Sequence, residues 1–233
     1  MIDVAAEVRA AEERARPHLL TTPAVPSAGL SADVGSAVVL KCENLQHTGS
    51  FKARGAVSKV LSLTREELDR GIVTASTGNH GAAVAYASGI VGAQALVVVP
   101  ENANPSKLAA IERLGAHIHV LGRDSVDSEL GARALAEERE ATFVSPYNDP
   151  AIIGGQGTLG LELLDQVGDL AAVFVAVGGG GLASGVAGII KAERPRVRVI
   201  GCSPAASAVM YHSLRAGEIL ELPSDPTLSD GTA

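Results

Sequence analysis

The sequence reads AVFVAVGGGGLASGVAGIIKAER over residues 172–194, and this stretch shows most directly how the fold is built. The apolar residues 172–177 predict a buried strand, and residues 182–194 predict a helix. Four glycines between them allow the backbone to turn tightly and to approach a ligand closely. The start of the helix adds unpaired N–H groups and a positive dipole end, which suit a phosphate. A turn without a ligand is the alternative, but it needs only one or two glycines.

The same alternation of strands and helices extends along the rest of the chain. Further helices are expected over residues 3–16, 51–61, 79–88, 105–114, 125–139, 152–167 and 205–214. Further strands are expected over residues 37–41, 72–75, 95–99, 117–121 and 197–202, and a Pro/Ser/Gly-rich connector over residues 21–35. Asp124 or Ser125 is the expected cap of one helix. Such alternation predicts an α/β fold of open, twisted, mostly parallel sheets covered by helices.

The composition excludes several classes of protein. The chain has 233 residues, 46% of them hydrophobic and 19% charged, which is too apolar for a disordered protein. Its net charge is −7 and only 3% of its residues are aromatic, so it lacks the basic, stacking surface of a nucleic-acid binder. The length accommodates one large domain or two small ones. The turn-rich residues 145–150 are the expected boundary.

The compartment follows from the cysteines and the N-terminus. Cys42 and Cys202 lie far apart, which disfavours a disulfide framework and a zinc site. The chain begins Met1-Ile2-Asp3, with no basic segment followed by an apolar one, so no signal peptide is expected. No apolar run is long enough to span a membrane. We therefore expect a cytoplasmic protein that binds neither membranes nor nucleic acids.

The residues around the four glycines narrow the choice of phosphate ligand. A P-loop needs a lysine after its last glycine, and none follows here. Gly178, Gly180 and Ala183 match a dinucleotide-binding pattern. The next strand, however, ends in Ser203 and Pro204 instead of the acidic residue that would hold the ribose. A compact phosphate cofactor is therefore favoured over NAD, and a nucleotide-dependent oxidoreductase is disfavoured.

A lysine stands at the expected start of a helix, in the stretch GSFKARG of residues 49–55. Ser50 is the expected cap, which places Lys52 in the first turn. A cation there opposes the helix dipole, so the dipole is expected to lower the pKa of Lys52 and favour a nucleophilic amine. The alternative is an ordinary surface lysine.

A third feature, STGNHG of residues 76–81, also lies between a strand and a helix. Its hydroxyls, its amide and the helix N–H groups form a small anion pocket. The alternatives are a helix cap provided by Asn79 or Ser76 and a packed histidine at His80. Because open α/β sheets bind ligands where strands give way to helices, the three features together fit pyridoxal phosphate (PLP) and an amino-acid carboxylate.

These motifs, together with GGQGT of residues 154–158, resemble those of the fold-type II PLP enzymes, specifically the threonine/serine dehydratases and serine racemases. The resemblance covers nearly the whole chain. It implies a two-domain fold like that of the tryptophan synthase β-subunit. Residues 1–45 and 146–233 would form the larger, PLP-binding domain, and residues 46–145 the smaller domain on the substrate side.

The resemblance also implies a role for each site residue. Lys52 would hold PLP as a Schiff base and later take the α-proton of the substrate, and Phe51 would pack on the cofactor ring. Asn79 would bond the phenolic oxygen of the ring. The phosphate would be bound by the backbone N–H groups of Gly178, Gly179, Gly180, Gly181 and Leu182. The substrate carboxylate would be held by Ser76, Thr77, Gly78 and His80.

The implied reaction is β-elimination from L-threonine or L-serine, which yields 2-oxobutanoate or pyruvate and ammonia. Another β-hydroxy amino acid, such as 3-hydroxyaspartate, is an alternative substrate, and serine racemisation is an alternative activity. Racemases of the family have serine at the position of Thr77, where it acts as acid or base, so a lyase is favoured. A non-catalytic PLP or amino-acid binding protein is an alternative of another class.

Three further expectations concern assembly, metals and length. Family members are commonly homodimers. Residues 201–209 contain no carboxylate, so no metal site is expected there. The chain stops shortly after Asp230-Gly231, where the family continues. The resemblance thus implies that the C-terminal part of the larger domain, with the group that faces the pyridine nitrogen, is missing.

Overall fold

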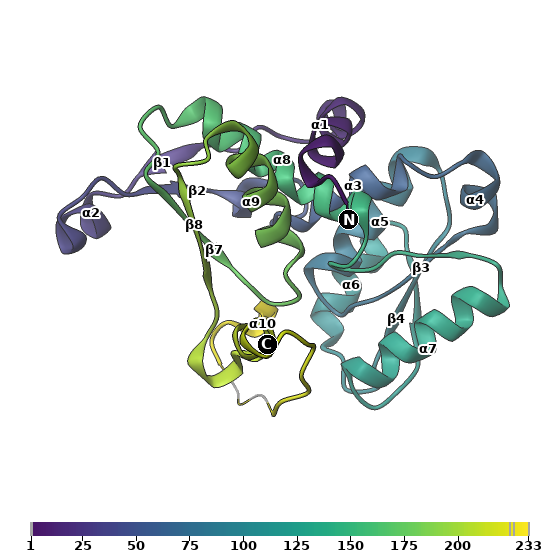
Figure 1. The fold of residues 1–233 in the computed structure, drawn as a ribbon. Helices are drawn as coiled ribbons and strands as arrows, with labels where there is room; N and C mark the ends of the chain where they lie inside the picture. The colour runs from purple at the N-terminus through teal and green to yellow at the C-terminus, as the bar shows by residue number, and fades with distance from the viewer. Residues whose placement is uncertain (1, 224, 226, 233) are drawn as a thin grey trace.

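The structure, a computed structural model, describes residues 2–223, 225 and 227–232. Figure 1 shows two groups of strands, one on each side of a central set of helices. No helix within the described residues is long and apolar enough to cross a membrane. The two cysteines, Cys42 and Cys202, carry free thiols.

One group of strands is a four-stranded parallel sheet. Its strands are β3 (Ile72–Ala75), β4 (Ala95–Val99), β5 (His117–Val120) and β6 (Thr142–Phe143), in the order β5-β4-β3-β6. The helices that connect them are α5 (Asn79–Val91), α6 (Pro105–Arg113) and α7 (Ser125–Glu138). Alternate residues of β4 face opposite sides, so Val97 packs in one core cluster with Ile111 of α6, and Val98 in another with Ala132 of α7. Both faces of the sheet are therefore covered.

The other group contains two strand pairs. Strands β7 (Ala172–Ala176) and β8 (Arg198–Cys202) are parallel and are connected by α9 (Gly181–Glu193). Strands β1 (Ala24–Pro26) and β2 (Val39–Lys41) are antiparallel and are connected by α2 (Ala28–Val34). Helix α10 (Val209–Ala216) follows β8.

The central helices are α1 (Val4–Ala15), α3 (Lys52–Val60) and α8 (Pro150–Gln166), with α8 packed against α1, α3 and α9. Glycines on α8 allow the close contacts. A Cβ atom on Gly155 would lie 2.5 Å from the carbonyl oxygen of Arg54 in α3. A Cβ atom on Gly157 would lie 2.2 Å from a methyl group of Val8 in α1. The glycine-rich motif of residues 154–158 thus has a packing role.

The predicted α/β class is confirmed, and β3 and β4 match their predicted bounds. Asp124, one of the two expected caps of α7, accepts bonds from two backbone N–H groups. Two expectations were wrong, and two short elements were missed. The connector of residues 21–35 contains β1 and α2, because β1 pairs with the distant β2. The helix expected over residues 205–214 is a 3-10 turn, Ala205–Ser207, followed by α10. The short elements α4 (Arg65–Arg70) and β6 were not expected.

The strand order locates a ligand site. From β3 the chain continues to β4 on one side, whereas the chain that leaves β5 returns through α7 to β6 on the other side of β3. Ligands of open α/β sheets bind beyond the carboxyl ends of the strands at such a reversal. The segments that follow β3 and β6 are residues 76–78 and 144–149.

Candidate active site

Lys52 is the first residue of α3, and its amine is directed to the segment that follows β6. Its Nζ donates a hydrogen bond of 2.8 Å to the carbonyl oxygen of Pro146. Burial lowers the pKa of Lys52 from 10.5 to about 8. The predicted lowering is therefore present, but desolvation is its cause, in place of the expected helix dipole. At pH 7 roughly a tenth of this amine is therefore unprotonated and nucleophilic, far more than for a lysine with the ordinary pKa.

The start of α3 differs from the prediction. Phe51 occupies the cap position, and no side chain caps the helix. The hydroxyl of Ser50 is buried without a hydrogen-bond partner, so the predicted cap by Ser50 was wrong. The Nζ of Lys52 lies 5.4 Å from the centre of the Phe51 ring. Phe51 and Leu182 both pack against the core cluster around α8 and α9.

His80 lies in the first turn of α5 and is buried. Its Nε2 is 3.1 Å from the carbonyl oxygen of Val144 and must donate, because a carbonyl only accepts. Burial, together with the charge of Lys52, lowers the pKa of His80 to about 3. The ring is thus neutral, with an unprotonated and unpartnered Nδ1. A bare lone pair repels a carboxylate, so only the backbone N–H of His80 is suited to hold one.

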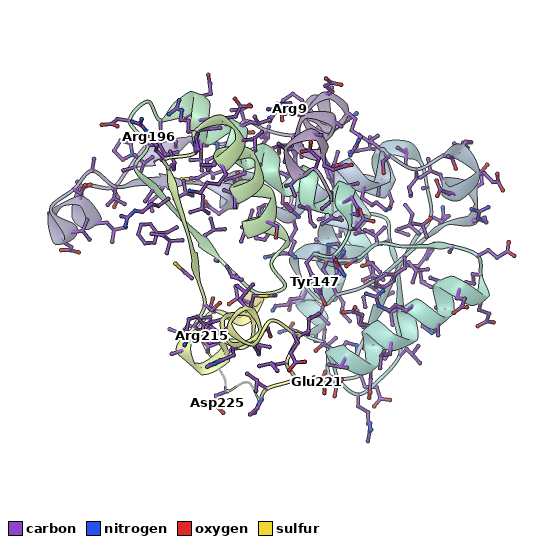
Figure 2. The ribbon with its side chains drawn as sticks, in the orientation of Figure 1. Arg9, Tyr147, Arg196, Arg215, Glu221 and Asp225 are labelled. Carbon is purple, nitrogen blue, oxygen red and sulfur yellow. The ribbon has the colours of Figure 1, made fainter. Side chains whose placement is uncertain are left out.

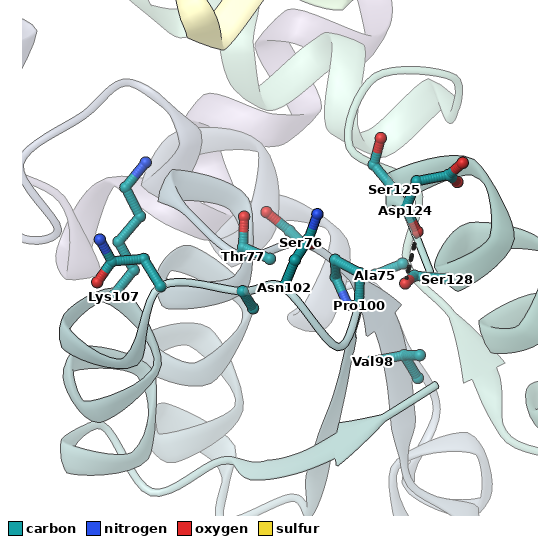
Figure 3. A pocket seen from close by; sticks show the side chains of 12 residues that line it. Ala75, Ser76, Thr77, Val98, Pro100, Asn102, Lys107, Asp124, Ser125 and Ser128 are labelled. Atoms are coloured by element: carbon teal, nitrogen blue, oxygen red, sulfur yellow. Dashed lines mark hydrogen bonds between the residues drawn. The ribbon is translucent and has the colours of Figure 1, made fainter. Parts of the chain in front are cut away.

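Ser76 and Thr77 line a cavity of about 390 Å³ at the carboxyl ends of β3 and β4, with Asn102, Lys107 and Ser125 on its other walls (Figure 3). The Oγ of Ser76 accepts a 3.2 Å hydrogen bond from the N–H of Gly78. Lys52 and the four glycines do not line this cavity.

Neither Asn79 nor Ser76 caps α5. Gly78 occupies the cap position, and no side chain bonds there. The side chain of Asn79 is exposed. The alternative that Asn79 or Ser76 caps this helix is therefore wrong. The first N–H groups of α5 are left without a side-chain acceptor.

The four glycines at residues 178–181, which we name the glycine loop, are favoured by the backbone conformation at one position and by close contacts at the other three. Gly180 has a left-handed backbone, with φ of 85°. A Cβ on Gly178 would lie 3.1 Å from the backbone of Thr232. Cβ atoms on Gly179 and Gly181 would lie 2.4 Å and 2.7 Å from atoms of Tyr147. Helix α9 begins at Gly181 with no side-chain cap, which leaves its first N–H groups open to an anion.

Tyr147 is the residue that the sequence did not reveal. It lies near the middle of the molecule (Figure 2), in the segment of residues 144–149, which had been interpreted only as a domain boundary. Within this segment, Val144 accepts from His80, Pro146 accepts from Lys52, and Tyr147 packs on the glycine loop. One short segment therefore contacts three of the motifs that were predicted separately. An aromatic residue beside a turn was the only signal available.

A buried ion network lies behind Lys52. Arg54, fully buried on α3, donates to Glu162 and to Glu43 over 2.7 Å each. Lys41 adds a 2.5 Å bond to Glu162. Burial alone would raise the pKa of Glu162, but Arg54 and Lys41 outweigh it and hold the pKa at about 2. The network connects α3 to α8 and to the segment that follows β2, and so fixes the helix that carries Lys52.

Parallel sheets, a partly buried lysine with a lowered pKa and an uncapped glycine loop define an α/β protein of the type that binds a phosphate-bearing carbonyl compound. Comparison with known proteins makes this class specific. The family described as pyridoxal-phosphate dependent enzyme matches residues 15–233, and the chain belongs to this family.

Individual relatives of the family carry two kinds of name. L-threonine ammonia-lyase of Geobacter sulfurreducens is 40% identical over 97% of this chain and 56% of its own length. Serine racemase of Oryza sativa subsp. indica is 40% identical over 96% of this chain and 66% of its own length. The structure of threonine deaminase isoform 2 from Solanum lycopersicum superimposes with a TM-score of 0.94 at 34% identity, over 99% of this chain and 67% of that one. The chain thus spans between half and two thirds of the length of these relatives.

The residues present fit the family cofactor. Near Lys52, two buried polar atoms, the Ser50 hydroxyl and the His80 Nδ1, have no hydrogen-bond partner among the residues that the structure describes. The glycine loop offers backbone donors at an uncapped helix start, where a phosphate is stabilised. Among the described residues no group of His, Cys, Asp and Glu side chains is arranged to hold a metal ion.

Proposed function

We propose that this chain carries the catalytic lysine and phosphate loop of a PLP-dependent ammonia-lyase that acts on L-threonine or L-serine. The observation that carries the proposal is the partly buried amine of Lys52, with a pKa of about 8, bonded to the segment that follows β6 at the reversal point of the sheet. Family membership and a relative named L-threonine ammonia-lyase support it. The products would be 2-oxobutanoate from threonine and pyruvate from serine, each with ammonia.

In this proposal each motif has a separate task. Lys52 would hold the cofactor covalently, and its Nζ would take the α-proton of the substrate. When bound, PLP supplies an electron sink for the carbanion that this proton transfer leaves. The glycine loop and Leu182 hold the phosphate through backbone N–H groups. Phe51 packs beside the cofactor ring and Asn79 bonds its phenolic oxygen.

The carboxylate of the substrate would be held by Ser76, Thr77, Gly78 and His80. His80 would contribute its backbone N–H, because the single N–H of its neutral ring already donates to the carbonyl oxygen of Val144. Burial of Lys52 lowers the proton affinity of its amine, so that it releases as well as accepts a proton near neutral pH. An amine whose pKa lies near the working pH can both accept the α-proton and release it again.

Two other activities remain alternatives within the same site. Serine racemisation is supported by the rice relative that bears that name, and it needs a second acid or base opposite Lys52. The family resemblance would give Thr77 that role, but its β-branch restricts the rotamers of its hydroxyl, which favours the lyase. The second alternative activity is elimination from an acidic substrate such as 3-hydroxyaspartate. An inactive protein that only binds PLP is the alternative of a different class.

The test combines trapping and product analysis. The chain is incubated with PLP, reduced with borohydride and digested, and the modified peptide is identified by mass spectrometry. We expect the adduct on Lys52 and none in Lys52→Ala. Lys191→Ala, in the last turn of α9, is the lysine control and should keep the adduct. With L-threonine, 2-oxobutanoate should form. No adduct on Lys52 in the wild-type chain refutes the proposal, and an adduct without any keto acid favours the binding protein.

We also propose the coarser organisation that the resemblance implies. The four-stranded sheet, built from residues 72–143, would be the centre of the smaller domain of residues 46–145. Residues 1–45 and 146–233, of which 1, 224, 226 and 233 lie outside the described residues, would form the larger one. A homodimer in the cytoplasm is proposed as well, and light scattering of the purified chain measures its mass.

A further inference from the structure

Tyr147 packs directly on the glycine loop. A Cβ atom on Gly179 would lie 2.4 Å from Cγ and 2.6 Å from Cδ1 of the Tyr147 ring. Gly179 does not have a left-handed backbone, so its φ does not demand glycine. It is the closeness of the ring that excludes a side chain at this position. Gly181 is different, because a Cβ there would lie 2.7 Å from the backbone oxygen of Tyr147.

The rest of the segment holds Tyr147 in place. The hydroxyl of Ser145 accepts a 3.0 Å bond from the N–H of Asn148. Asp149 caps α8 and forms a 2.8 Å ion pair with Lys59 of α3. Between these anchors, the carbonyl of Pro146 accepts from Lys52. The ring of Tyr147 therefore rests on a backbone that is fixed to the helix of Lys52.

The side chain of Tyr147 is half-buried. Burial raises the pKa of its hydroxyl, and the charges of Glu129 and Arg133 on α7 act on it as well. The hydroxyl is thus neutral at physiological pH. The atoms of Tyr147 nearest to a Cβ on Gly179 are the ring carbons Cγ, Cδ1 and Cδ2.

We propose that Tyr147 is a positioning residue for the cofactor: its ring fixes the glycine loop relative to Lys52 and so determines how tightly the loop holds the phosphate. The inference rests on the proposed function in one respect, that the loop binds the cofactor phosphate. Because the ring acts through shape, the hydroxyl is dispensable. Phenylalanine should replace tyrosine, whereas alanine should release the loop.

The experiment measures binding of PLP to the whole chain by absorbance titration, with the adduct on Lys52 as a second readout. We expect Tyr147→Ala to raise the Kd at least tenfold, while saturating PLP still yields the full adduct. Tyr147→Phe should stay within threefold of wild type. The melting temperature of the PLP-free chain is measured in parallel. A merely structural role would lower that temperature and leave the Kd unchanged.

Two glycine variants supply the matched test. Gly179→Ala should also raise the Kd at least tenfold, and less so in the Tyr147→Ala background, where the ring is absent. Gly181→Ala should be equally harmful in both backgrounds, because it meets the backbone of Tyr147. If Gly179→Ala raises the Kd by the same factor with and without Tyr147→Ala, the proposal is overturned. It is also overturned if Tyr147→Ala folds and binds PLP with the Kd of the wild-type chain. If that variant does not fold, the Kd of Gly179→Ala decides alone. A wild-type chain that forms no Lys52 adduct refutes the proposed function instead.

Discussion

The amine of Lys52 donates a 2.8 Å hydrogen bond to the carbonyl oxygen of Pro146, 94 residues further along the chain. This bond joins the start of α3 to the segment after β6, whose neighbouring residue Tyr147 packs on the glycine loop. The reactive amine and the phosphate loop are therefore connected through two adjacent residues. Displacement of this segment would disturb both.

The first prediction concerns the pH dependence of Lys52. Its pKa of about 8 means that the unprotonated amine accumulates as the pH rises through 8, instead of through 10.5. The rate of adduct formation with PLP should rise with a midpoint near pH 8, measured by absorbance. The unfolded chain keeps the proton up to about pH 10.5, so the free energy of unfolding should rise between pH 8 and 10.5. Lys52→Met should lack that rise, and an equal rise in the variant contradicts the assignment.

The second prediction concerns acid stability and His80. With a folded pKa of about 3 against 6.5 in the unfolded chain, protonation favours unfolding below pH 6.5. The free energy of unfolding should fall as the pH decreases from 6.5 towards 3. His80→Gln, whose amide can still donate to Val144, should have a shallower decline over that range. Urea denaturation at several pH values measures it, and parallel curves for the two chains would exclude His80 as the cause.

The third prediction concerns the ion network around Arg54. Arg54→Met leaves Glu43 and Glu162 buried without their main cation and should lower the free energy of unfolding by about 3–5 kcal/mol. The additional change Glu162→Gln removes one of the stranded charges and should restore part of the loss. Urea denaturation of the four chains of this cycle gives the coupling energy. A double variant as unstable as the sum of the two single variants speaks against a shared network.

The fourth prediction concerns Thr77 and the choice between elimination and racemisation. Thr77→Ser removes only the methyl group and frees the hydroxyl to rotate, so the ratio of D-serine to pyruvate formed from L-serine should increase. Thr77→Ala removes the hydroxyl and should abolish any D-serine while pyruvate formation persists. Chiral chromatography and a keto-acid assay measure the two products. D-serine as the main product of the unchanged chain would overturn the preference for a lyase.

Much of the fold could be predicted because its elements are specified locally. The apolar runs that became β3 and β4, and the capping side chain of Asp124, contain their own structural signal. Strand β1 could not be found in this way, although its partner β2 lies within the strand predicted over residues 37–41. Strand β1 has only three residues, and it is a strand because β2 lies beside it.

For the site, the sequence by itself determined which residue types are present: a lysine at a helix start, a hydroxyl-bearing loop and four consecutive glycines. These suffice to indicate a phosphate cofactor, because their chemistry follows from local backbone and side-chain properties. The tertiary structure alone decided the environment of these groups. It buries Lys52, which lowers the pKa by desolvation, it keeps His80 neutral against Val144, and it places Tyr147 on Gly179. Burial and contact depend on residues distant in the chain, so no local pattern encodes them.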